Sequence, residues 1–149
     1  MRISDYLDSR LIVFLDALSR DEAIGSLIDL LDQEGHLPEK EVFRKAIFTR
    51  EELVSTGIGM GVAVPHAKLK NYPDFFMAVG IQQQQGLDWN AMDKAPVRLI
   101  FMIGGPDNRQ TEYLQILSLL TSAIRNVDLR KKLLNVRTPE EALALFSHF

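Results

Sequence analysis

Residues 55–68 of this chain read Ser-Thr-Gly-Ile-Gly-Met-Gly-Val-Ala-Val-Pro-His-Ala-Lys, and the interpretation of the whole sequence starts from them. Three glycines in five positions let backbone amides approach a ligand closely, and successive amides in such a turn form an anion-binding nest. Val62-Ala63-Val64 reads as a short buried strand, which Pro65 ends because it has no amide donor. We therefore expect His66 at a strand end, beside a phosphate-binding loop.

Residues 55–66 and several neighbouring segments resemble one known protein family. Residues 55–66 resemble the signature of Enzyme IIA domains of the fructose, mannitol and nitrogen-related type, which belong to the bacterial phosphoenolpyruvate phosphotransferase system. Arg50-Glu51, the segment 93–103 and the segment 113–120 also look like the family, in its order. The resemblance runs from about Val42 to the C-terminus, and it implies a mixed sheet sandwiched by helices.

Length and composition fit one domain over residues 1–149. The chain is 46% hydrophobic and 25% charged, with a formal charge of −3, which is ordinary for a globular protein and offers no basic field for nucleic acid. It contains no cysteine, and no two histidines have the i, i+4 spacing of a helical zinc motif, so we expect no metal site. No apolar stretch reaches the roughly 20 residues that span a bilayer, and the N-terminus does not read as a signal peptide. We expect a cytoplasmic protein without membrane insertion.

Hydrophobic periodicity and capping signals predict the elements. The apolar run 11–15 reads as a buried strand, and Ser19-Arg20-Asp21-Glu22 fits a capping box that opens a helix ending at Gly35. Pro38 opens a second helix, strands are expected over 75–81 and 97–103, and a long helix follows Asn108. Shorter helices are expected over 128–134 and 138–146. The three longer helices each have an expected apolar face: Ile24, Leu27, Ile28 and Leu31 in the first; Val42, Phe43, Ala46 and Ile47 in the second; and Tyr113, Ile116, Leu117, Leu120 and Ile124 in the third. The fold class is α/β, a three-layer sandwich with a mixed β-sheet flanked by helices on both faces.

An imidazole suits phosphoryl carriage because its neutral form is nucleophilic near pH 7. Positive charge nearby favours that form, since it disfavours imidazolium. Arg50, expected near a helix C-terminus, is our candidate for this charge, because a guanidinium forks two hydrogen bonds onto phosphate oxygens. The alternative for Arg50 is a solvated cation favoured by the helix dipole, and for His66 a structural histidine in a binding domain of another kind.

The remaining candidates around the phosphate are small polar residues and glycines. Ser55 and Thr56 carry hydroxyls that could donate to it, although both residue types are also common in loops and caps, and Gly59 and Gly61 supply the phosphate-binding turn. Lys68 and Lys70 are expected at the solvated surface, as are His36 and His148. Phosphoryl transfer needs positioning and charge stabilisation, so we expect no cofactor.

The resemblance implies the rest of the scheme. His66 would accept a phosphoryl group from HPr or its nitrogen-system counterpart, with Arg50 in the place of the family's active-site arginine, and pass it to a IIB component or signal by its phosphorylation state. The alternative is a regulatory protein-binding module whose affinity His66 phosphorylation switches, or which no longer needs it. The sequence of residues 55–59 favours the nitrogen-related or fructose-like branch. Many members carry a second histidine where this chain has Tyr113, which hydrogen-bonds but carries no positive charge at neutral pH.

Overall fold

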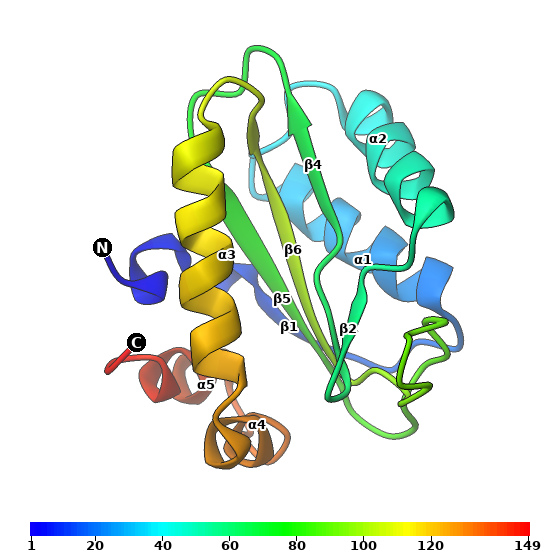
Figure 1. Cartoon of the computed structure of the whole chain (residues 1–149), viewed down its shortest axis with the longest axis vertical. Helices are drawn as coiled ribbons and strands as arrows, with labels where there is room; N and C mark the ends of the chain where they lie inside the picture. The colour runs from blue at the N-terminus through cyan, green and yellow to red at the C-terminus, as the bar shows by residue number, and fades with distance from the viewer.

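The apolar runs of the sequence form one six-stranded sheet, and the amphipathic segments form five α-helices that cover it, in a computed structural model that describes residues 1–149 (Figure 1). The strands are β1 (Ile12–Leu15), β2 (Gly57–Gly59), β3 (Val62–Ala63), β4 (His66–Leu69), β5 (Phe76–Gln82) and β6 (Leu99–Pro106). The helices are α1 (Arg20–Gln33), α2 (Lys40–Leu53), α3 (Gln110–Ile124), α4 (Val127–Leu133) and α5 (Pro139–Leu145), with short 3₁₀ helices η1 (Ile3–Tyr6) and η2 (Ser9–Leu11). None of the helices combines the length and apolar character that a bilayer crossing requires.

The sheet is mixed, as the sequence predicts. Its strand order is β1-β5-β6-β3-β2. Strands β3 and β4 pair with the same edge of β6: β3 with its N-terminal part and β4 with its C-terminal part. Strand β1 is parallel to β5, β3 and β4 are parallel to β6, and the β5–β6 and β2–β3 pairs are antiparallel. The two central strands, β5 and β6, are buried along their whole length, because helices cover both faces.

The edge of β6 carries an interruption that positions His66. Val62 pairs with Leu99, and His66 pairs with Ile103. Between these two pairs the chain passes through Pro65, which has no amide to donate, although its carbonyl accepts from the Ile103 amide at 2.9 Å. The sequence therefore correctly predicts that Pro65 ends one strand, but His66 begins a further strand that it does not predict.

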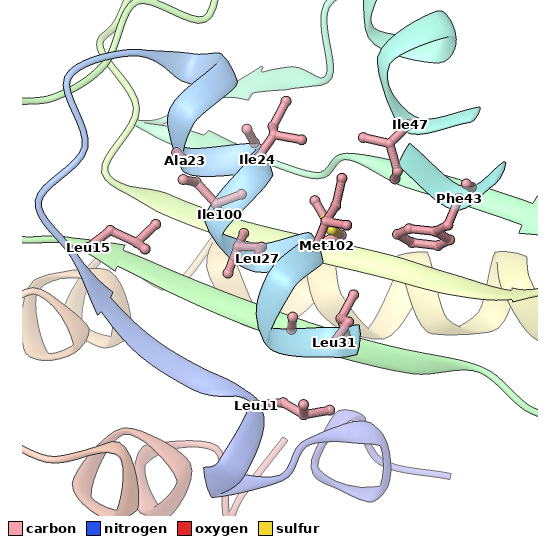
Figure 2. Packing of buried hydrophobic residues seen from close by; sticks show 14 of the residues in the cluster. Leu11, Leu15, Ala23, Ile24, Leu27, Leu31, Phe43, Ile47, Ile100 and Met102 are labelled. Carbon is pink, nitrogen blue, oxygen red and sulfur yellow. The ribbon is translucent and has the colours of Figure 1, made fainter. Parts of the chain in front are cut away.

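Two hydrophobic cores lie on opposite faces of the sheet. On one face α1 and α2 bury residues such as Leu27, Leu31 and Phe43 against Ile100 and Met102, as Figure 2 shows from close by. On the other face α3, α4, α5 and η1 pack over the alternate side chains of β5 and β6. This arrangement confirms the three-layer α/β sandwich, and it places α2 and α3 on either side of β4 (Figure 1).

Capping explains where the helices begin. The Ser19 hydroxyl accepts from the Glu22 amide at the start of α1, and the Thr138 hydroxyl accepts from the Glu141 amide at the start of α5, as predicted. Helix α2 begins at Lys40 rather than at Pro38. Val42, expected on the apolar face of α2, is 47% exposed, because the core side of this helix is made by Phe43 and Ile47.

Strand β6 extends further than predicted, through Gly104 and Gly105 to Pro106. A Cβ atom on Gly104 would collide with the Phe76 ring on one face of the sheet, and a Cβ on Gly105 would collide with the Phe75 ring on the other. The two glycines thus let aromatic rings lie directly on the β6 backbone on both faces.

Candidate functional site

His66, the first residue of β4, is oriented by the backbone of its own segment. Its Nδ1 lies 3.0 Å from the Val64 carbonyl oxygen. Because a carbonyl only accepts, this contact assigns the proton to Nδ1 and leaves the lone pair on Nε2. The side chain is half-buried, and Nε2 has no hydrogen-bond partner within the protein. The free nitrogen is therefore the nucleophilic one.

The surroundings of His66 keep its ring neutral. Burial lowers the pKa of His66 below its ordinary value of 6.5, and the positive charges of Arg50 and Lys68 lower it further. The hydrogen bond to Val64 and the negative charge of Glu51 act in the opposite direction without reversing the shift. At neutral pH the imidazole is a nucleophile without charge of its own, next to two cations.

Arg50 lies in the last turn of α2, as predicted. Its Nη1 donates to the Val54 carbonyl at 3.1 Å, which caps the end of the helix, and no carboxylate pairs with it. Its charge lowers the pKa values of both His66 and Tyr113, so the guanidinium acts on both rings. The electrostatic effect of Arg50 on the His66 ring places the two residues in the same part of the molecule.

Tyr113, on the first turns of α3, faces His66. The centroids of the two rings are 5.6 Å apart, and the tyrosine ring also stacks on Phe75, with centroids 6.1 Å apart. Burial raises the pKa of Tyr113 to about 12, so its hydroxyl stays protonated and neutral. At the position where the resemblance implies a second histidine, this chain thus has an uncharged aromatic side chain.

Ser55 and Thr56 hold the loop that precedes β2. The Ser55 hydroxyl donates to the Trp89 carbonyl and accepts from the Gly57 amide. The Thr56 hydroxyl donates to Glu51 Oε1 and accepts from the indole N–H of Trp89, and the Thr56 amide donates to Glu51 Oε2 at 2.7 Å. Both hydroxyls already have protein partners in this arrangement, so their assignment to phosphate stays a prediction.

Glu51 is a buried residue whose contacts the sequence does not reveal. It is only 3% exposed, and its carboxylate accepts from the Thr56 amide, the Thr56 hydroxyl and the Trp89 indole. The Thr56 carbonyl in turn accepts from the Val64 amide at 2.9 Å, and Val64 holds the His66 ring. The buried carboxylate therefore fixes the imidazole through two backbone links. The sequence signal is its place beside Arg50, but Trp89 lies 38 residues away.

Gly59 and Gly61 lie in the turn of the β2–β3 hairpin, both with positive φ, at 92° and 75°. The Gly61 carbonyl accepts from the Leu99 amide, whereas His66 pairs with Ile103, four residues further along β6, or about 13 Å at the usual strand rise. The structure does not bring these glycines to the imidazole. Their conformation serves the hairpin, whose tip is closed by a hydrogen bond from the Met60 amide to Asp93 at 3.0 Å.

Lys68 is partly exposed, and its ammonium group contacts the aromatic ring beside His66, which the sequence does not predict. It stands two residues after His66 on the same face of β4, with Nζ 4.3 Å from the centroid of the Tyr113 ring and donating to Gln110. If the sequence analysis had predicted a strand over β4, the alternation of side chains along a strand would have placed Lys68 on the same face as His66. Lys70 is exposed, as expected, and His148 is exposed as well, whereas His36 is half-buried against Phe76.

Comparisons with known proteins identify the family of the chain. Residues 5–149 match the family model described as "Phosphoenolpyruvate-dependent sugar phosphotransferase system, EIIA 2". The chain is 34% identical over 125 residues to the nitrogen regulatory protein of Escherichia coli (strain K12), covering 83% of this chain and 75% of that one. It is 28% identical over 148 residues to the fructose-specific EIIABC component of Bacillus subtilis (strain 168), covering 99% of this chain but only 23% of that protein.

A solved structure extends the likeness to three dimensions. The nitrogen regulatory protein IIA-Ntr of Neisseria meningitidis superposes with a TM-score of 0.88 at 29% identity, covering 97% of this chain and 99% of that one. The mixed sheet between two helical layers is therefore the fold of a solved IIA protein. The chain belongs to the EIIA 2 family of the phosphoenolpyruvate-dependent sugar phosphotransferase system.

Proposed function

We propose that this protein is a phosphohistidine carrier that accepts a phosphoryl group on Nε2 of His66. The observation that carries the proposal is the hydrogen bond from Nδ1 to the Val64 carbonyl, which leaves Nε2 unprotonated beside Arg50. The donor is a phosphohistidine on an HPr-type or nitrogen-type phosphocarrier. In the transfer its N–P bond breaks, a bond from phosphorus to Nε2 forms, and the departing imidazole keeps the electron pair. The His66 proton stays on Nδ1 throughout.

Arg50 stabilises the charge that the phosphoryl oxygens carry during this step. A guanidinium offers paired donors in a plane, which suits two oxygens of one phosphoryl group. Because Arg50 has no carboxylate partner, it is available for this role without breaking an ion pair.

The acceptor, on this proposal, is either a IIB component or a protein whose binding depends on the phosphorylation state of His66, and the protein acts in the cytoplasm. Similarity over most of the chain to proteins named nitrogen regulatory protein supports the nitrogen-related branch. The second candidate function is therefore a regulatory module that His66 phosphorylation switches by adding negative charge to a docking surface.

Mass spectrometry after incubation with phosphoenolpyruvate, Enzyme I and either phosphocarrier tests the proposal. We expect one acid-labile phosphate on the wild-type protein and none on His66→Ala, which keeps its fold because this half-buried ring adds little to either core. Phosphate on His66→Ala, or a folded wild-type protein that takes up none from either donor, would refute the assignment.

Arg50→Ala tests the role of the guanidinium in the same assay. We expect phosphoryl uptake to slow by about 100-fold, the usual effect of removing one charge-stabilising donor. Arg44→Ala is the matched control, because Arg44 lies on the same helix but pairs with Asp29 and Glu41. Equal rates for the two variants would reduce Arg50 to a helix-capping residue.

A further inference from the structure

Lys68 is a second cation that acts on His66, and it comes from a different element than Arg50. Arg50 comes from α2, whereas Lys68 extends from β4 toward the start of α3, where its ammonium group lies over the face of the Tyr113 ring. The Tyr113 ring is itself in contact with the His66 ring. The aromatic wall thus carries the imidazole and the ammonium group side by side.

The bonding of Lys68 leaves its charge available. An ammonium group has three donors, and the one hydrogen bond that Lys68 makes is to the neutral amide oxygen of Gln110. No carboxylate pairs with it, whereas the neighbouring Arg109 pairs with both Asp74 and Glu112. Holding a cation on an aromatic face and a neutral amide is weaker than pairing it with an anion, so an incoming anion can displace these contacts.

We propose that the Lys68 ammonium group binds the phosphoryl group on His66, exchanging Gln110 for a phosphoryl oxygen, so that Lys68 and Arg50 hold the phosphoryl group from two sides. This inference rests on the proposed function of His66 and names the residue that supplies the charge missing from Tyr113. A lysine side chain has the length and freedom to follow the oxygen while its stem stays on the tyrosine ring.

Chemical phosphorylation with phosphoramidate, followed by mass spectrometry, tests this contact without a carrier protein. Lys68→Met keeps the length and apolar stem but removes the charge, Lys68→Arg restores a charge, and Lys70→Met is the matched control on an exposed lysine. We expect uptake on His66 to fall by about tenfold in Lys68→Met, the effect of losing one charge-assisted hydrogen bond, and to stay near the wild-type rate in the other two.

A titration of the His66 ring by NMR separates an electrostatic role from a structural one. The charges facing His66 are Arg50, Lys68 and Glu51, so removing the Lys68 charge raises the pKa of His66, whereas Lys70→Met leaves it unchanged. If Lys68→Met matches Lys70→Met in both rate and titration, the inference is overturned while the carrier function stands. If wild-type His66 takes up no phosphate from phosphoramidate or from a carrier, the proposed function fails, and this inference fails with it.

Discussion

At the scale of single residues, the tautomer of His66 determines the chemistry. The Val64 carbonyl accepts the Nδ1 proton, burial disfavours a second proton, and Arg50 and Lys68 add to that effect. On the proposed function, the ring is thus held in its reactive state before a phosphoryl donor arrives. A histidine in water near pH 6.5 would spend half its time as imidazolium, which is no nucleophile.

This arrangement predicts the pH dependence of phosphoryl uptake. The pKa of His66 lies below 6.5, so the rate of uptake from phosphoramidate holds its plateau below pH 6.5 and declines only at more acidic pH. A rate profile of the wild-type protein across this range checks the expectation. A midpoint at or above 6.5 would show that the ring is not protected from protonation in solution.

The same shift predicts how folding stability varies with pH. The unfolded chain binds a proton at His66 near pH 6.5 while the folded chain does not, so stability present above pH 6.5 is lost as the pH falls toward the folded pKa. Urea unfolding of wild type and His66→Gln at about pH 7 and pH 5.5 measures this loss. We expect a smaller loss in His66→Gln, and identical losses would contradict the assigned shift.

At the scale of elements, the segment between α2 and β4 works as one unit. Glu51 links the last turn of α2 to Thr56 and Trp89, and the Thr56 carbonyl accepts from the amide of Val64, the residue that follows β3. The carboxylate is buried but fully supplied with donors, which is the condition under which a buried charge is tolerated.

Glu51→Ala is expected to lower the free energy of unfolding by about 3 kcal/mol, because it leaves the Thr56 amide buried without an acceptor. Glu52→Ala, one residue further on an exposed position, is expected to stay within about 0.5 kcal/mol of wild type. Urea denaturation of the two variants gives the comparison. Equal midpoints would mean that the Glu51 network contributes nothing to stability.

Elements with local signals could be predicted from the sequence, and elements with distant partners could not. The N-cap hydroxyls of Ser19 and Thr138 act within one helical turn, so α1 and α5 begin where expected, although the reciprocal bonds of a full capping box are not formed. Strand β4 follows directly on Pro65 and is defined by its pairing with β6, which no local pattern shows. His66 and Arg50 were found through the motif, whereas Glu51 and Lys68 depend on contacts with Trp89 and Tyr113 that only the fold creates.

At the scale of the whole molecule, a series of side-chain contacts connects the central strand β6 with His66. The Phe75 ring lies on Gly105, Tyr113 stacks on Phe75, and His66 lies against Tyr113. Gly105, the Phe75 ring and the Tyr113 ring thus form a column of contacts between β6 and the imidazole. The first residue of the column has no side chain, because any Cβ would occupy the space of the Phe75 ring.

Gly105→Ala is expected to destabilise the protein by about 2 kcal/mol through overpacking, and to slow phosphoryl uptake by displacing Tyr113. Gly25→Ala is the control: this glycine lies inside α1, its Cβ would come no closer than 3.7 Å to any neighbour, and alanine favours the helix by about 0.5–1 kcal/mol. Calorimetric melting of both variants checks the opposite signs. If Gly105→Ala were as stable as Gly25→Ala, the Phe75 and Tyr113 rings would be able to move aside without lowering the stability of the protein.

The hydrogen bond between His66 and Val64 also bears on the order of events in a relay. This hydrogen bond fixes the orientation of the imidazole. Rotating the ring by a half-turn would break the bond and would move a phosphoryl group on Nε2 toward the backbone. A donor and an acceptor must then approach Nε2 from the same direction, and each excludes the other. On the proposed function the protein follows a ping-pong scheme, without a ternary complex, and excess unphosphorylated acceptor competes with the donor for the free protein.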